Sequence, residues 1–158
     1  MLGNILFTNN VETSNPGYQK LQEKAVKEYS LPQKIAIPKI NLTVSITEGG
    51  IKDNGWILSK TEVMYVPTSG KLGEGFNTVL YAHKRKGLFL HLNKLQKWDR
   101  IVVYDSQNKE YNFEVFSKEV VKPIEVERIK TNEENTLTLF TCDGWLDKSR
   151  LVVKAKMI

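Results

Sequence analysis

Hydrophobic and polar residues alternate along most of the chain after residue 34. The alternation is clearest at 110–121, where Tyr111, Phe113 and Val115 share one side. A period of two is typical of strands that bury one face and leave the other in water. Shorter runs of alternating or continuous apolar residues occupy 35–46, 63–66, 78–82, 101–104, 136–141 and 151–153. The pattern predicts roughly eight short strands.

Turn-forming residues separate these runs. Gly49-Gly50 and Asn54-Gly55 are turn signals, residues 68–77 contain three glycines, and residues 105–109 form a polar segment between two strands. Pro38 interrupts the first apolar stretch, which predicts either two strands or one bulged edge strand. Residues 87–92 are predicted to form a helical turn on the surface, and 123–135 a loop. Short strands at close intervals predict a mostly-β fold, a barrel of about eight strands.

The N-terminal part has a different pattern. Residues 1–7 are mostly apolar but too few to span a membrane, and the rest of 1–15 is mostly polar, which predicts a leader. Asn15-Pro16 then provides an N-cap followed by proline at the first helical position. Apolar residues then recur every three or four positions up to Leu31, before Pro32. We therefore predict a leader with an amphipathic helix over 1–31 and a barrel domain over 32–158. A helix packed on the domain is favoured over a loose spacer that holds the domain away from a membrane.

Composition narrows the class of protein. The chain has 158 residues, 41% of them hydrophobic and 26% charged, as in a soluble globular domain. Lys and Arg exceed Asp and Glu by 23 to 18, with no long run of like charge, so charge alone gives little support to nucleic-acid binding. The sequence contains no run of 18 apolar residues that would span a membrane. Its single cysteine excludes an internal disulfide and a cysteine metal cluster.

That cysteine, Cys142, lies at the end of a predicted strand, where its thiol could be held in place and still reach a substrate. Cys142 follows the apolar run 136–141, His83 follows the buried run 78–82, and Arg150 comes eight residues after Cys142. If Arg150 opens the antiparallel neighbour of the Cys142 strand, the three residues meet at one rim of the barrel. A thiolate, an imidazole and a guanidinium together support acyl transfer. Each residue alone is more often structural, as we expect for His91.

The residues around all three positions resemble the sortase family. Thr-Leu-Phe-Thr-Cys at 138–142 is similar to the strand that ends in the sortase nucleophile, and Arg-Leu-Val-Val at 150–153 to the arginine strand. Asn-Thr-Val-Leu-Tyr-Ala-His at 77–83 is similar to the histidine segment. The likeness covers about residues 34–156. Three departures, at Phe76, Tyr81 and Ala82, stand where smaller residues are usual, and they change the expected pocket wall without removing a catalytic group.

The resemblance implies a closed sortase-like barrel and a cysteine transpeptidase. Cys142 would attack the Thr–Gly bond of a Leu-Pro-x-Thr-Gly-like sorting signal, with His83 and Arg150 as catalytic partners. An amine of a cell-wall precursor or a pilin lysine would accept the acyl group. The enzyme would act at the extracytoplasmic face of the membrane or the cell surface of a Gram-positive bacterium. We expect the membrane anchor of the family to be absent from this chain.

Substrate contacts are predicted at Thr141 and Tyr81, with the segment 122–135 helping to line the groove. Trp145 is expected either to cover the thiol as a lid or platform, or to pack on the barrel rim. No cofactor is expected. Some sortases bind calcium through acidic loop residues, and the candidates here, which we expect to be solvated instead, are Glu74, Glu125, Glu127, Glu133 and Glu134.

Other classes fit less well. Papain-like peptidases place the cysteine before the histidine, and L,D-transpeptidases carry a Ser-x-Gly-Cys pattern that is not found around Cys142. A non-enzymatic barrel that binds a wall polymer or nucleic acid remains the alternative, with Tyr81, Trp98 and Trp145 as stacking platforms. Loss of Cys142 would leave such a module functional and would inactivate a transpeptidase. Of the two, the transpeptidase is favoured, with no nucleic-acid partner.

Overall fold

The computed structural model describes residues 29–125, 133–143 and 148–158, with the side chains of residues 142 and 143 excepted. The predicted leader and almost all of the predicted N-terminal helix lie outside the described residues. The described chain enters the domain at Ser30, whose backbone pairs with Leu72 in an isolated bridge.

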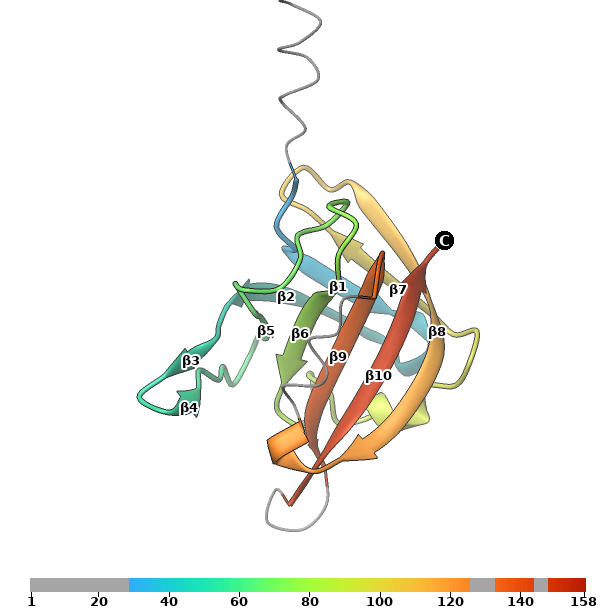
Figure 1. The fold of residues 1–158 in the computed structure, drawn as a ribbon. Coiled ribbons are helices and arrows are strands. Elements are labelled where there is room, and N and C mark those ends of the chain that lie inside the picture. The colour runs from blue at the N-terminus through green and yellow to red at the C-terminus, as the bar shows by residue number, and fades with distance from the viewer. Residues whose placement is uncertain (1–28, 126–132, 144–147) are drawn as a thin grey trace, which may run out of the picture.

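A closed barrel forms the body of the molecule (Figure 1). Around the barrel, the strands in the described residues follow the order β1 (Lys34–Ile37), β2 (Leu42–Glu48), β5 (Val63–Tyr65), β6 (Thr78–Ala82), β9 (Thr136–Asp143), β10 (Ser149–Met157), β8 (Glu110–Val121) and β7 (Arg100–Tyr104). Pairing of β7 with β1 closes the ring. The prediction of a mostly-β, eight-stranded closed barrel is confirmed.

A two-stranded hairpin stands apart from the barrel sheet. Strands β3 (Ile51–Lys52) and β4 (Gly55–Trp56) pair with each other and with no barrel strand in the described residues. They lie between β2 and β5 in the sequence and project from the side of the barrel in Figure 1. The turn signals at Gly49-Gly50 and Asn54-Gly55 mark the base and the tip of this hairpin.

Two strand pairs in the barrel are parallel, and one of them, β6 with β9, ends beside the predicted site residues. Strand β6 runs parallel to β9, and β2 parallel to β5, whereas the other barrel pairs are antiparallel. Since the carboxyl ends of parallel neighbours lie at the same edge of a sheet, β6 and β9 finish together. Strand β10 follows β9 as its antiparallel neighbour, so it begins where β9 ends.

Alternation along the strands separates two apolar clusters. On β9, Leu137 and Leu139 face the barrel interior, where the main core lies, and Phe140 belongs to a second cluster on the outer face. Both clusters are well buried, since Leu139 is 0% and Phe140 3% exposed. Burial of both faces of β6 and β9 explains why their sequences are nearly continuous apolar runs.

Two local expectations are refined by the structure. At Pro38 the chain leaves β1, makes the 3-10 turn η2 (Pro38–Ile40), and returns as β2, so the stretch is two strands. Proline favours this because it has no N–H for the ladder. The stretch at 87–92 is a turn that leads into η3 (Leu92–Lys94), but Leu88 and Phe89 are buried in the main core rather than on the surface. Their apolar side chains fill part of the barrel interior, and the spacing of apolar residues in the sequence did not predict this burial.

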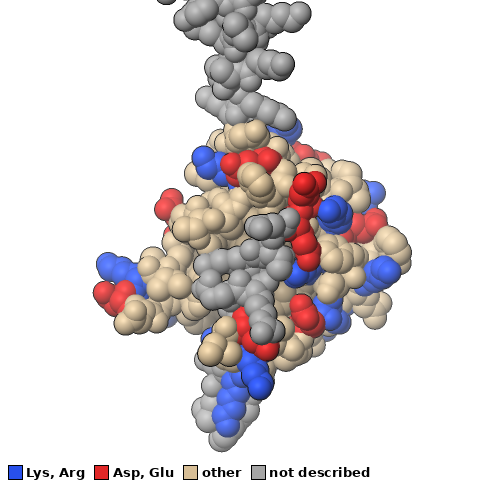
Figure 2. Space-filling model, viewed as in Figure 1, with Lys and Arg blue, Asp and Glu red and all other residues tan. Residues whose placement is uncertain are grey.

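Charge is spread over the surface, as the sequence indicated. Figure 2 shows Lys and Arg side chains interspersed with Asp and Glu side chains on the face turned to the reader. Within the described part of the chain, no helix is long and apolar enough to cross a membrane.

Candidate active site

His83 stands immediately after β6, whose residues are all buried. Its side chain is half-buried. The carbonyl oxygen of His83 accepts hydrogen bonds from the backbone N–H groups of Arg85, at 3.0 Å, and Phe89, at 3.2 Å. Phe89 is fully buried, so the turn that follows His83 is anchored in the core. The histidine is therefore carried by a strand on one side and a fixed turn on the other.

Cys142 and Arg150 lie directly opposite each other on neighbouring strands. In the antiparallel pairing of β9 with β10, Arg150 is the register partner of Cys142. For Cys142 the structure describes the backbone position. Arg150 is half-buried, and its Nη1 donates a hydrogen bond to the Ser149 carbonyl oxygen at 3.0 Å. Directly opposed residues in an antiparallel pair have Cα atoms about 4.5–5.5 Å apart, close enough for their side chains to interact.

The parallel pairing of β6 and β9 places His83 level with Cys142 along the two strands. Ala82 is the register partner of Thr141, so His83 and Cys142 are the next positions on the two strands. Buried Thr141 reinforces this junction, because its hydroxyl donates to the Ala82 carbonyl oxygen at 2.5 Å. His83, Cys142 and Arg150 thus come from three adjacent strands at one end of the barrel, the spatial arrangement that the sequence spacing predicted. Their catalytic roles stay a prediction.

Three aromatic rings cover the outer face of β6 and β9, two residues before His83 and Cys142. Tyr81 and Phe140 stack with their ring centroids 5.2 Å apart and 13° between ring planes. The Trp56 indole of the β3–β4 hairpin meets both rings edge-on, with its centroid 4.8 Å from that of Tyr81 and 5.4 Å from that of Phe140. Edge-on and offset contacts suit the quadrupoles of aromatic rings. The hairpin is therefore packed on the strands that carry the histidine and the cysteine.

The Tyr81 hydroxyl fixes the base of that hairpin. It donates to the Ile57 carbonyl oxygen at 2.6 Å and accepts from the Gly50 N–H at 2.8 Å. Its distance to the Gly50 carbonyl oxygen is 3.2 Å. Burial raises the pKa of Tyr81 above its usual value, against the opposing effect of the Gly50 backbone hydrogen bond. The hydroxyl therefore stays protonated and remains a donor at neutral pH.

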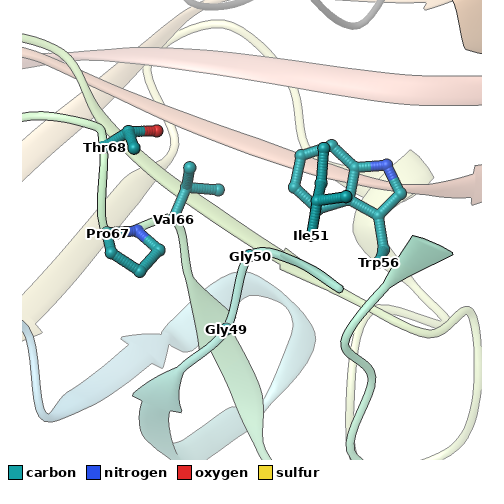
Figure 3. A pocket seen from close by; sticks show the side chains of 7 residues that line it. All are labelled: Gly49, Gly50, Ile51, Trp56, Val66, Pro67 and Thr68. Atoms are coloured by element: carbon teal, nitrogen blue, oxygen red, sulfur yellow. The ribbon is translucent and has the colours of Figure 1, made fainter. Parts of the chain in front are cut away.

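A cavity of about 320 Å³ opens between the hairpin and the segment after β5. Figure 3 shows Ile51 and Trp56 on its hairpin side and Val66, Pro67 and Thr68 across from them, with the chain at Gly49 and Gly50 between the two. Most of its walls are apolar side chains and glycine backbone, so it suits an apolar group better than a charged one.

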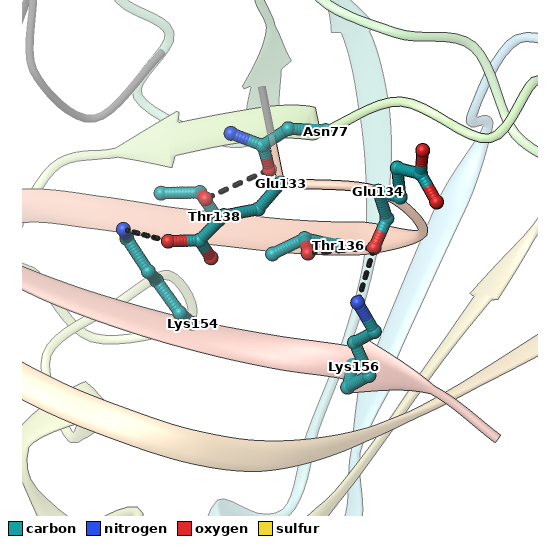
Figure 4. A network of polar contacts seen from close by, with 7 residues as sticks. All are labelled: Asn77, Glu133, Glu134, Thr136, Thr138, Lys154 and Lys156. Atoms are coloured by element: carbon teal, nitrogen blue, oxygen red, sulfur yellow. Dashed lines mark hydrogen bonds and ion pairs between the residues drawn. The ribbon is translucent and has the colours of Figure 1, made fainter. Parts of the chain in front are cut away.

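A polar network holds the opposite end of β9 (Figure 4). Thr138 donates to the Asn77 side-chain oxygen at 2.8 Å in a buried contact between β9 and the residue before β6. Lys154 pairs with Glu133 at 3.2 Å, and Lys156 Nζ donates to the Glu134 carbonyl oxygen at 2.6 Å. These contacts tie the end of the segment between β8 and β9, which was predicted to line the groove, to β10.

The remaining predicted site residues have mixed outcomes. Tyr81 is 1% and Thr141 2% exposed, and both engage backbone carbonyls; direct substrate contact by either stays a prediction. Trp145 and Glu127 lie outside the described residues. Of the calcium candidates, Glu74 and Glu125 accept hydrogen bonds from the nearby backbone N–H groups of Lys71 and Lys122. No group of three or more His, Cys, Asp or Glu residues in the described ranges is arranged to hold a metal ion.

Sequence reasoning missed Trp56, Phe140 and Gly49 as contributors to this end of the molecule. Asn54-Gly55 before Trp56 was recognised as a turn signal, but the packing partner of Trp56 is about 25 residues away along the chain and cannot be read from local spacing. Phe140 was recognised only as one residue of an apolar strand. The side that it faces follows from the barrel register.

Known proteins resemble the chain in sequence and in fold. A family model described as "Sortase domain" matches residues 35–158. Sortase A of Bacillus anthracis is 26% identical over 152 residues, covering 94% of this chain and 70% of that protein. The structure of an SrtA sortase from Actinomyces oris superposes with a TM-score of 0.68 and 27% identity, covering 83% of this chain and 82% of that one.

A pilus-associated structure is also similar. The structure of "Sortase C1 of GBS Pilus Island 1" superposes with a TM-score of 0.67 and 25% identity. The match covers 80% of this chain and 63% of that one, so the chain spans less than two thirds of that structure.

Proposed function

The chain belongs to the sortase family, and from this premise we propose that it is a cysteine transpeptidase that cleaves a sorting signal and joins the acyl part to an amine. The signal proposed is similar to Leu-Pro-x-Thr-Gly, cut between Thr and Gly. Cys142 is the nucleophile, His83 the proton carrier, and Arg150 the group that stabilises the oxyanion.

One observation carries this assignment. Arg150 is the register partner of Cys142, and His83 is the neighbour of Cys142 on the parallel strand β6. A positive charge next to a thiol lowers its pKa and favours the thiolate that attacks the carbonyl. A cysteine placed elsewhere in the barrel would have neither partner, and it would be an ordinary buried thiol.

The proposed reaction has two balanced steps. The Cys142 thiolate adds to the carbonyl carbon of the scissile Thr–Gly bond, and the Arg150 guanidinium stabilises the oxyanion. Collapse of this intermediate breaks the C–N bond, and His83 as imidazolium protonates the leaving glycine amine, which leaves a thioester. The incoming amine then attacks the thioester, gives its proton to neutral His83, and releases the Cys142 thiolate and a new amide.

The family and the chemistry also suggest partners and a place of action. We propose protein substrates that carry the sorting signal, with an amine acceptor from a cell-wall precursor or a pilin lysine, at the outer surface of the cell membrane. The pilus-island sortase among the similar structures supports a pilin acceptor as one of these two. The proposed steps use no metal ion, since the thiolate, imidazolium and guanidinium supply nucleophile, proton and positive charge.

A direct test is mass spectrometry of the protein with a Leu-Pro-x-Thr-Gly peptide library and a small primary amine. We expect a peptide cut after Thr and joined to the amine, together with a thioester adduct on Cys142. Cys142→Ala is the matched control, since it changes one atom at the reactive position and is expected to abolish both products. Formation of the same amide by Cys142→Ala would exclude the mechanism. A folded wild-type protein that gives no adduct with any library member would exclude this signal class.

A further inference from the structure

The β3–β4 hairpin packs on the outer face of β6 and β9, beside the proposed catalytic residues. Tyr81 and Phe140 precede His83 and Cys142 by two positions each, and they share a level in the β6–β9 ladder. A strand rises about 3.3 Å per residue, so their rings lie about 7 Å from the reactive level. The Trp56 indole covers both rings. A peptide laid along this face with its scissile residue at the Cys142 position therefore meets the indole about two positions before the scissile residue.

Trp56 is placed to contact such a peptide rather than only to fill the core. Tyr81 and Phe140 beneath it are 1% and 3% exposed, whereas Trp56 itself is half-buried and also lines the apolar cavity of Figure 3. Part of its indole is thus presented at the surface next to the reactive end. A compact, rigid ring such as that of proline can pack against the indole with little loss of side-chain entropy, whereas a longer side chain would collide with it.

The hairpin is held in this position by one hydroxyl. Tyr81 bonds the backbone on both sides of the hairpin, at Gly50 before β3 and at Ile57 after β4. The N–H of Ile57 donates to the Gly50 carbonyl oxygen at 2.8 Å and closes the base. Close approach of the hydroxyl requires glycine at position 49, because a Cβ there would lie 2.4 Å from the Tyr81 oxygen and 2.9 Å from the Met64 Cβ.

From these contacts we propose that Trp56 is a specificity-determining residue, and that Tyr81 is a positioning residue that acts through it. Trp56 forms an end wall for the acyl side of the sorting signal and selects a compact, rigid residue, such as proline, two positions before the scissile residue. We place the acyl part of the substrate on the Trp56 side of Cys142 because it stays bound to the enzyme as the thioester. The amine would then approach from beyond the ends of β6 and β9, past His83 and Cys142. The inference rests on the proposed transpeptidation.

The test compares peptides that differ only at the selected position. Leu-Pro-Ala-Thr-Gly is set against the same peptide with Leu or Phe in place of Pro, and kcat/KM is measured for each. Trp56→Ala removes the wall and is expected to raise the preference for Leu or Phe relative to Pro by about tenfold, mainly through KM. Trp56→Phe keeps a ring and should restore a ratio near that of the wild type. Tyr81→Phe should shift the ratio in the same direction as Trp56→Ala, by less.

A matched control separates the loss of the Tyr81 hydrogen bonds to the hairpin from the loss of any buried hydroxyl. Tyr65 is also buried, and its hydroxyl donates to backbone carbonyl oxygens, at Ser69 (3.0 Å) and Gly70 (3.3 Å), away from the hairpin. Tyr65→Phe should leave the peptide ratio unchanged. Hydrogen exchange provides a readout independent of turnover: Tyr81→Phe should speed exchange of the Gly50 and Ile57 amides, and Tyr65→Phe should not.

The outcomes are distinguishable. A wild-type enzyme that processes the Pro peptide, with ratios unaltered in Trp56→Ala and Tyr81→Phe, would refute the specificity role while leaving the proposed function intact. Unchanged exchange at Gly50 and Ile57 in Tyr81→Phe would refute the positioning role. Failure of the wild type to process any peptide would overturn the proposed function, and the specificity assignment with it.

Discussion

At the scale of single residues, the ladder partners of Cys142 decide what its thiol can do. Arg150 stands opposite it on β10, half-buried, with Nη1 bound to the Ser149 carbonyl oxygen. That hydrogen bond orients the guanidinium. An arginine has a planar set of five donors, whereas lysine has a compact ammonium on a flexible stem. Orientation, and not charge alone, should therefore matter at this position.

Arg150→Lys is expected to lower kcat/KM by about a hundredfold, because the charge remains while the oriented donors are lost. The melting temperature should stay close to that of the wild type, since the long apolar stem is retained. Steady-state kinetics with the best peptide of the library provides the measurement. Arg100→Lys, at an exposed position on β7, is the matched control and should behave as wild type. Near-normal turnover of Arg150→Lys would remove Arg150 from the reaction.

At the scale of elements, the parallel pair β6–β9 positions the site. Parallel neighbours are far apart in sequence, so their alignment depends on contacts that fix the register. Thr138 and Asn77 provide one at the beginning of both strands, and Thr141 with the Ala82 carbonyl oxygen provides another at their ends. The two hydrogen bonds are buried and connect the same pair of strands, so they oppose a slip that would move His83 away from Cys142.

Thr138→Val tests the first of these contacts. The valine is nearly isosteric, but it takes the hydroxyl donor from the buried Asn77 oxygen, and we expect a loss of about 1–3 kcal/mol in the free energy of unfolding. Urea denaturation gives this value. Thr43→Val, at an exposed position on β2, is the control and should change stability by less than about 0.5 kcal/mol. Equal stability of the two variants would show that the buried hydrogen bond does not hold the register.

At the scale of the whole molecule, the core of the barrel and the candidate site share a structural segment. The turn after His83 donates N–H groups back to the His83 carbonyl oxygen, and its buried residues Leu88 and Phe89 belong to the main core. The packing that stabilises the barrel therefore also fixes the backbone of the histidine. A defect in the core at this point should affect both stability and turnover.

Phe89→Ala should lower the free energy of unfolding by about 3–5 kcal/mol, because it leaves a cavity in the core. It should also reduce kcat at temperatures where the protein is still folded, since the turn that holds His83 loses its anchor. Phe116→Ala is the control: Phe116 is 38% exposed on β8, so stability and turnover should stay near the wild-type values. A stability loss with unchanged kcat would show that the His83 backbone is fixed by β6 alone.

The sequence by itself located most of the barrel strands and the turns between them, and it supplied the candidates for the reactive residues. Period-two alternation is a local property, and it located β7, β8 and β10 as well as the strands that carry His83 and Cys142. The order of the three residues, each within a motif-like segment, was sufficient to indicate the family. The spacing between Cys142 and Arg150 contributed less by itself: it allowed the two residues to meet across an antiparallel pair, and the β9–β10 register places them opposite each other.

Only the tertiary structure decided which faces are covered and by what. Trp56 packs on Tyr81 and Phe140 across about 25 and 85 positions of sequence, and Leu88 and Phe89 occupy the core where a surface turn was predicted. Contacts at such separations depend on barrel closure and on the parallel β6–β9 register, which local patterns do not encode. Local patterns therefore located the strands that carry the proposed catalytic residues, because alternation depends on neighbouring positions. The packing of distant segments determined what surrounds those residues.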